Sequence, residues 1–227
     1  MSGIVEKALT FARECHSGDN SGHDFEHIRR VLANAEKIAE ETPEADAEVV
    51  RLAAVLHDVD DYKLHNGGAR AELFLREAGA ADEVREKVLA VIEAIGFSKS
   101  GSKPRFTMIE QEVVSDADKL DAMGAVGVCR TVMYSAATGR ELFNEREFPK
   151  ENLTAAEYKD KNRPGNHSVN HFFDKLLKLK GAMQTVAGRC EAERRHEFMV
   201  MFLQEFFDEV RAPEWRAYLG DYLKRAE

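Results

Sequence analysis

Apolar residues recur every three or four positions along most of the chain, which is the spacing of one face of an α-helix. The clearest stripe consists of Phe25, Ile28, Leu32, Ala35 and Ala39. Thr42-Pro43 end the helix that this stripe predicts. Ser21, followed three residues later by Asp24, stands before the stripe as a helix start of the capping type. The pattern therefore predicts a helix in which His27 lies at the border of the core-facing side.

The same spacing predicts further helices over about 45–57, 69–77, 84–95, 108–137, 169–177 and 198–206, and a short end piece near 215–222. Gly124 and Gly127 fall inside the longest of these helices, and we expect them to allow close helix packing. Between residues 138 and 168 the pattern weakens into charged residues with Pro149, which predicts a long surface excursion. No alternating strands are visible, so the fold prediction for residues 1–227 is all-α, a single irregular helical bundle forming one domain.

Composition narrows the class of protein. The chain has 227 residues, 44% of them hydrophobic and 32% charged, which suits a compact domain with a sizeable core. Its apolar runs are far shorter than the ~20 residues that cross a membrane. The amino end lacks the layout of a signal peptide, and three scattered cysteines support neither a disulfide framework nor a thiolate zinc site. These features predict a cytoplasmic protein with no membrane partner.

The net charge of −9 opposes binding to nucleic acid, whose phosphate backbone needs a basic surface. Small anions are still acceptable ligands, because a bound metal and local lysine or arginine side chains reverse the field at one site. The charge therefore favours a small-molecule partner over a nucleic-acid partner.

The dipeptide His57-Asp58 follows the apolar run 49–56, whose helix should lie in the core. Burying a carboxylate and an imidazole is costly unless charge or coordination compensates, and a divalent cation compensates both. His27 and Asp118 are candidates for the further ligands that such an ion needs. Two imidazoles and two carboxylates suit Mn²⁺, Fe²⁺, Co²⁺, Ni²⁺ or Zn²⁺, with positions left for water or substrate. The donor set therefore permits hydrolysis by metal-activated water.

These residues resemble the H…HD…D signature of the HD-domain phosphohydrolase superfamily, and the whole chain resembles its small stand-alone bacterial branch, typified by YedJ and YpgQ. The segments that carry the resemblance are 22–31, 57–63, 116–127 and 168–179. The resemblance implies an all-helical fold of the HD-domain type and hydrolysis of phosphate esters or nucleotide phosphoanhydrides. It also implies a single divalent ion, among Mn²⁺, Ni²⁺, Co²⁺, Fe²⁺, Zn²⁺ and Mg²⁺, and these metal ligands: His27, His57, Asp58 and Asp118.

Two of these assignments have competitors nearby. The family's first ligand precedes an x-x-R-V pattern, which Arg30-Val31 supply after His27. His23 is then expected to orient a ligand or to face substrate, in a catalytic role. Asp118 fits the family pattern better than Asp116, which we interpret as a cap or a supporting acid.

Other side chains are candidates for catalysis and phosphate binding. Asp61 could orient or deprotonate the attacking water, and Lys63 could hold a phosphate oxygen, although a solvated loop with a surface ion pair is the alternative. Asp121 lies one turn after Asp118, and we expect it to bind a metal-bound water or to pair with Lys119.

More distant residues are weaker candidates for binding substrate. Arg130, three turns past Asp118 on the same expected helix, could reach substrate or form a structural salt bridge. His171 and Lys175 share a helix face and could line the site, with a structural role for His171 as the alternative. The histidines without a partner pattern are expected in solvent or loops: His16, His65, His167 and His196.

The combined interpretation is a metal-dependent phosphohydrolase whose small phosphorylated substrate is a nucleotide. The alternative function is a metal- or nucleotide-binding sensor without significant turnover. The phenylalanine-rich segment 198–207 is expected to pack the core, with an oligomer contact, such as a homodimer, as the alternative.

Overall fold

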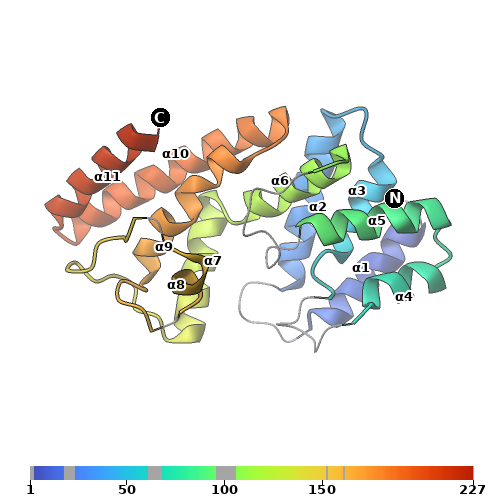
Figure 1. Ribbon diagram of the computed structural model, residues 1–227, viewed down its shortest axis with the longest axis horizontal. Helices are drawn as coiled ribbons and strands as arrows, with labels where there is room; N and C mark the ends of the chain where they lie inside the picture. The colour runs from blue at the N-terminus through green and yellow to red at the C-terminus, as the bar shows by residue number, and fades with distance from the viewer. Residues whose placement is uncertain are drawn as a thin grey trace. The chain divides into compact units, whose positions relative to one another are not determined.

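The computed structural model describes residues 3–17, 24–60, 68–95, 106–151, 153–160 and 162–226, and every regular element in these ranges is a helix (Figure 1). The prediction of an all-α fold is confirmed. Among the described residues, no helix combines the length and the apolar character needed to cross a membrane.

The chain forms two compact units, which are described separately. The first comprises Met1–Asp121 and Ala182–Cys190, and the second comprises Ala122–Gly181 and Glu191–Glu227. The expectation that residues 1–227 form one domain stays a prediction.

The first unit is built around a helix that is buried on nearly every side. This helix, α3 (Ala47–Leu56), contacts α1 (Gly3–Cys15), α2 (Phe25–Glu40), α5 (Asp82–Ile95) and α6 (Ile109–Asp121). Seven of its ten residues are buried, including all of Leu52–Leu56. Apolar residues all round a helix are typical of a central position, so His57 and Asp58 leave the end of α3 inside the unit. The remaining helix, α4 (Arg70–Glu77), contacts α5.

Helix α2 begins at Phe25, the first residue of the predicted apolar stripe, with Asp24 as its N-cap. The Asp24 side chain accepts a hydrogen bond from the His27 backbone N–H at 3.0 Å. Ser21, the other residue of the predicted cap, lies outside the described residues. The helix turns Ile28, Val31 and Leu32 into the core together with His27, so the position of this histidine in the stripe was predicted correctly.

The prediction of one long helix over 108–137 is wrong, because the chain turns at Ala122-Met123 between α6 and α7 (Gly124–Thr138). Gly124 has a φ of 69°, which favours glycine. A Cβ on Gly127 would lie 2.3 Å from the Ala122 carbonyl oxygen. The two glycines are therefore needed for the turn between α6 and α7, in addition to any role in helix packing. Arg130 is consequently not on the helix that carries Asp118.

The second unit contains α7, α8 (Ala155–Lys159), α9 (Ser168–Asp174), the 3₁₀ turn η2 (Leu176–Lys178), most of α10 (Val186–Glu209) and α11 (Pro213–Ala226). A further 3₁₀ turn, η3 (Lys180–Ala182), includes the point in the chain where one unit ends and the other begins. Trp215 of α11 is buried, with Phe207 and Phe143 rings around it. Helices α1 and α8 have no counterpart in the predicted set. In α1 the apolar stripe relies on small residues, Ala8 and Ala12, which give a weak periodic signal.

A buried carboxylate joins α6 to the segment that opens α10, within the first unit. Asp116 is fully buried and accepts hydrogen bonds from Gln184 N–H at 3.0 Å, and from Thr185 N–H and Oγ1 at 2.8 Å each. A Cβ on Gly188 would lie 2.4 Å from Asp116 Oδ2, so only glycine fits there. The interpretation of Asp116 as a capping acid agrees with these contacts.

We expect Asp116→Ala to lower the free energy of unfolding by roughly 2–4 kcal/mol, because three donors, two of them buried, lose their acceptor. Urea unfolding followed by circular dichroism measures the change. The control is Asp82→Ala, which removes an 84% exposed carboxylate paired with Arg85 and should cost no more than about 1 kcal/mol. Equal losses in the two variants would contradict the role given to Asp116.

Candidate metal centre

Three helices of the first unit bring His27, His57 and Asp118 together. His27 comes from the first turn of α2, His57 is the C-cap of α3, and Asp118 comes from α6. Each offers one ligand atom, and these three atoms all lie within 4.8 Å of one another. The two imidazoles face each other through their Nε2 atoms, which are 3.3 Å apart.

Asp58 completes the group. Its Oδ2 lies 3.5 Å from His27 Nε2 and 3.3 Å from His57 Nε2. Asp118 Oδ1 lies 3.6 Å and 3.9 Å from the same two nitrogens. Ligand atoms that share one ion at about 2.0–2.2 Å stand roughly 3.0–3.5 Å apart in right-angled to tetrahedral arrangements. The observed separations, 3.3 to 3.9 Å, therefore fit a shared divalent cation after a small contraction.

Each imidazole is fixed through its other nitrogen. His57 Nδ1 lies 2.9 Å from the Ala54 carbonyl oxygen, and since a carbonyl only accepts, this nitrogen carries the hydrogen. His27 Nδ1 lies 2.7 Å from Asp121 Oδ2. In both rings the lone pair of the neutral form is therefore on Nε2, the atom that faces the centre. Metal-binding histidines in proteins are oriented in this way.

Asp121 lies behind His27 and not beside Lys119, while its expected role at a metal-bound water stays a prediction. Its carboxylate is buried and also accepts hydrogen bonds from Arg30, Nε to Oδ1 at 2.6 Å and Nη2 to Oδ2 at 3.2 Å. Lys119 instead contacts Ser115 and lies 4.0 Å from Asp116 Oδ1. Asp121 is one turn further along α6 than Asp118. It therefore meets His27 at Nδ1, whereas Asp118 faces Nε2 on the other side of the ring.

The electrostatics of the group favour a bound positive charge. Burial by itself lowers the pKa of His57, but the charge and hydrogen bond of Asp58, the charge of Asp118 and the bond to Ala54 raise it to about 9. Burial also opposes protonation of His27, and Asp121 and Asp58 together raise its pKa above the usual value. Three carboxylates, from Asp58, Asp118 and Asp121, therefore favour positive charge on this pair of imidazoles, and a bound divalent cation would also balance the negative charge of these carboxylates.

Several predicted site residues are not part of this group. His23, Asp61 and Lys63 lie outside the described residues, and their roles stay predictions. Arg130 is on α7 in the second unit, while His171 is on α9 and Lys175 directly follows it. Burial and nearby cations, Lys175 among them, lower the pKa of His171 to about 3, so this ring is neutral. The assignment of these three residues to substrate binding also stays a prediction.

Two other histidines, His16 and His167, which were expected in solvent or loops, lie outside the helices and are buried. His167 is buried and caps α9: its Nδ1 accepts from Asn170 N–H at 3.2 Å, and its Nε2–H donates to the Glu147 carbonyl at 3.0 Å. His16 is buried as well.

Sequence reasoning also missed Arg30 as the partner of Asp121. The signal for that pair was weak, since Arg30 lies one turn after His27 and nothing in the sequence places Asp121 beside it.

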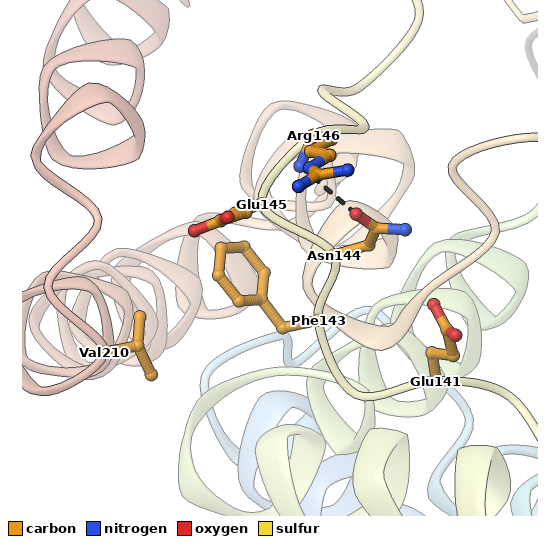
Figure 2. A pocket seen from close by; sticks show the side chains of 6 residues that line it. All are labelled: Glu141, Phe143, Asn144, Glu145, Arg146 and Val210. Carbon is orange, nitrogen blue, oxygen red and sulfur yellow. Dashed lines mark hydrogen bonds between the residues drawn. The ribbon is translucent and has the colours of Figure 1, made fainter.

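An open pocket of about 540 Å³ lies in the second unit. It is lined by Glu141, Phe143, Asn144, Glu145, Arg146 and Val210 (Figure 2). The hydrogen bond drawn in Figure 2 joins the Arg146 backbone N–H to Asn144 Oδ1 at 3.2 Å. Two carboxylates and a single arginine give this pocket no surplus of positive charge for an anionic substrate, and none of the predicted site residues lines it.

Comparison with known proteins matches residues 24–123 to the HD domain model. YpgQ of Bacillus subtilis is 31% identical over 91% of this chain and 93% of its own. Its crystal structure in complex with ADP has a TM-score of 0.71 to this chain, with 30% identity over 91% of this chain and 97% of that one.

Two further crystal structures are similar. A Lactobacillus plantarum protein has a TM-score of 0.80 and 31% identity, covering 93% of this chain and 98% of its own. An HD-superfamily hydrolase of Bacillus thuringiensis has a TM-score of 0.71 and 34% identity, covering 92% and 97%. Because this similarity extends over most of the chain and includes the segments that carry the histidine and aspartate cluster, the chain belongs to the HD superfamily of hydrolases, in the branch that includes YpgQ.

Proposed function

We propose that this protein is a divalent-metal-dependent phosphohydrolase. The observation that carries the proposal is the convergence of two imidazole Nε2 atoms and two carboxylates, from His27, His57, Asp58 and Asp118, at the buried end of α3. Membership of a hydrolase superfamily supports the reaction class. Hard oxygen and borderline nitrogen donors suit Mn²⁺, Fe²⁺, Co²⁺, Ni²⁺, Zn²⁺ or Mg²⁺.

The protein's own contribution is to hold the ion and to keep its ligands oriented. When bound, a divalent ion supplies a Lewis acid that makes water easier to deprotonate and that offsets phosphoryl charge. His57 is held by the Ala54 carbonyl, and His27 is held by Asp121, which Arg30 holds in turn. Such fixed ligands need no rearrangement when substrate arrives.

We also propose that the substrate is a nucleotide. The support is that YpgQ, 30% identical over most of both chains, has been crystallised with ADP. A chain with a net charge of −9 needs local cations to hold such an anion. Lys63, Arg130, His171 and Lys175 are our candidates for that binding, and substitution of each should raise KM more than it lowers kcat if it acts on bound phosphate.

We expect the untagged protein to retain one divalent ion per chain and Asp58→Ala to lose it, because the variant removes a carboxylate that contacts both imidazoles. Elemental analysis after dialysis measures the content. Asp60→Asn is the matched control: the Asp60 carboxylate instead accepts from Arg70 N–H at 2.8 Å and Ala71 N–H at 3.2 Å, so its metal content should be unchanged. Retention of metal by Asp58→Ala would mean that the site is drawn wrongly.

Activity is tested by phosphate and pyrophosphate release from nucleoside mono-, di- and triphosphates and simple phosphate esters, with each candidate ion in turn. We expect turnover with the metal-loaded protein, loss of it with a chelator, and a decrease of at least about 100-fold in Asp58→Ala. Release from esters but not from nucleotides would contradict the nucleotide proposal alone. A metal-loaded protein that hydrolyses nothing in the panel would contradict the hydrolase proposal.

The bond from Asp121 to His27 predicts a graded effect on metal affinity. Asp121→Ala should weaken the affinity about 10–100-fold, as is usual when the partner of a metal-binding histidine is removed. Asp121→Asn keeps an oxygen that can accept from His27 Nδ1–H and should lose less. Metal titration of the dialysed variants gives the two affinities, and equal affinities for wild type and Asp121→Ala would show that the bond has no role in holding the ion.

A further inference from the structure

Among the described histidines of the first unit, three lie with Nδ1 next to a hydrogen-bond acceptor. Two of them, His27 and His57, are the imidazoles of the candidate metal centre. The third, His16, directly follows α1, and its Nδ1 lies 2.8 Å from the Ala12 carbonyl oxygen one turn earlier. Because a carbonyl only accepts, this nitrogen of His16 carries the hydrogen, and Nε2 of the neutral ring is left with a lone pair.

The lone pair of His16 is enclosed. The residue is only 3% exposed, and no described group donates a hydrogen bond to its Nε2. A buried acceptor without a donor is unfavourable, so a protein keeps one where water or a ligand supplies the donor or where the atom is used in the reaction. In both His57 and His16 a backbone carbonyl holds Nδ1. In His57 this leaves Nε2 facing the metal centre, whereas in His16 it leaves Nε2 without a described protein partner.

The position of His16 connects it with the metal centre. Helix α1 packs against α3 and α2, the helices that carry His57 and His27. The charges of Asp58, His57 and His27 all act on His16, which places the ring in the electrostatic neighbourhood of three metal ligands. Burial lowers the pKa of His16, and the charges of His57 and His27 lower it further. The hydrogen bond to Ala12 and the charge of Asp58 raise the pKa by less, so the ring is neutral at pH 7.

We propose that His16 is the catalytic base of the centre, and that its Nε2 accepts a proton from the water that attacks phosphorus. This inference rests on the proposed phosphohydrolase function and adds the residue that activates the nucleophile. His16 is not among the residues that share the 4.8 Å metal-ligand group, so we assign it no role as a ligand of the ion.

The step balances without a co-reactant. The water oxygen forms a bond to phosphorus while one of its protons passes to Nε2 of His16. The bond from phosphorus to the leaving oxygen breaks with its electron pair on that oxygen, which takes a proton from solvent. The imidazolium of His16 then returns its extra proton to solvent, and the ring is neutral for the next turnover.

The test compares two substitutions of His16 in metal-loaded protein. His16→Asn keeps an amide N–H in reach of the Ala12 carbonyl but removes the atom at Nε2. His16→Gln extends an amide to the Nε2 position, where it can accept a hydrogen bond but not a proton. We expect both to lower kcat about 100-fold or more, the usual size of general base catalysis, with metal content and melting temperature near those of wild type. His196→Asn makes the same chemical change on α10, outside the proposed site, and should leave kcat unchanged.

A rate for His16→Asn close to wild type would overturn the proposal, and a normal rate for His16→Gln alone would overturn the proton transfer. A second measurement does not depend on turnover: ¹⁵N NMR of labelled histidine, metal-free and Zn²⁺-loaded. We expect the Nδ1–H form of neutral His16 between pH 6 and 8, with an Nε2 shift that moves when Zn²⁺ binds. A doubly protonated ring, an Nε2–H form, or an Nε2 shift insensitive to Zn²⁺ would overturn the placement. An inactive wild type with the expected shifts would contradict the proposed function and support the placement of His16.

Discussion

The structure of the first unit depends on the cost of placing ionisable groups at the end of a buried helix. Helix α3 is apolar on nearly every side, so His57 and Asp58 leave it within the core, where charge is expensive. The surrounding helices place further polar groups next to this pair, namely His27 from α2 and Asp118 from α6. The core of this unit therefore contains a polar cluster whose ligand atoms lie close enough together to share one divalent cation.

Orientation is as important as proximity in this cluster. His27 and His57 each use Nδ1 for a hydrogen bond behind the site, to Asp121 and to the Ala54 carbonyl. The backbone carbonyl of a helix and a buried carboxylate have different chemistry, but both only accept, and both therefore leave Nε2 as the electron-pair donor. His16 is held by the same kind of contact, which is why its unused Nε2 is informative about function.

The buried acid that precedes Asp118 by two residues has a different role. Asp116 accepts backbone and hydroxyl hydrogen bonds at the start of the segment that leads into α10, so it fixes α6 in the first unit. Successive acids on α6 thus have separate tasks: Asp116 stabilises the fold, Asp118 faces the imidazoles, and Asp121 orients His27. Helical geometry contributes to this separation, because side chains two residues apart, such as Asp116 and Asp118, point about 160° apart around the helix axis, whereas Asp121 lies one turn beyond Asp118 and is rotated by only about 60°.

Helical periodicity in the sequence was enough to predict an all-α fold, most of the helices, and the inward position of His27 in α2. The apolar run before His57-Asp58 was enough to predict a buried pair in need of compensation, and the resemblance to the HD-domain pattern selected His27 and Asp118 as its partners. These features are local, since a helix repeats every 3.6 residues and each segment carries its own pattern. The weakly apolar α1 and the turn at Ala122–Gly124 were missed, because small residues and glycine give no clear periodic signal.

Contacts between distant segments were decided by the tertiary structure alone. Asp121 and Arg30 are 91 positions apart, and only the packing of α2 against α6 makes them partners behind His27. The burial of His16 likewise depends on how α1 packs, and its own sequence neighbours gave no sign of it. Sequence by itself therefore determined which side chains are suited to a metal centre. The packing of the helices determined which of these side chains meet and which nitrogen each histidine presents. The reason is that hydrogen-bond partners across a core are set by distance in three dimensions and not by spacing along the chain.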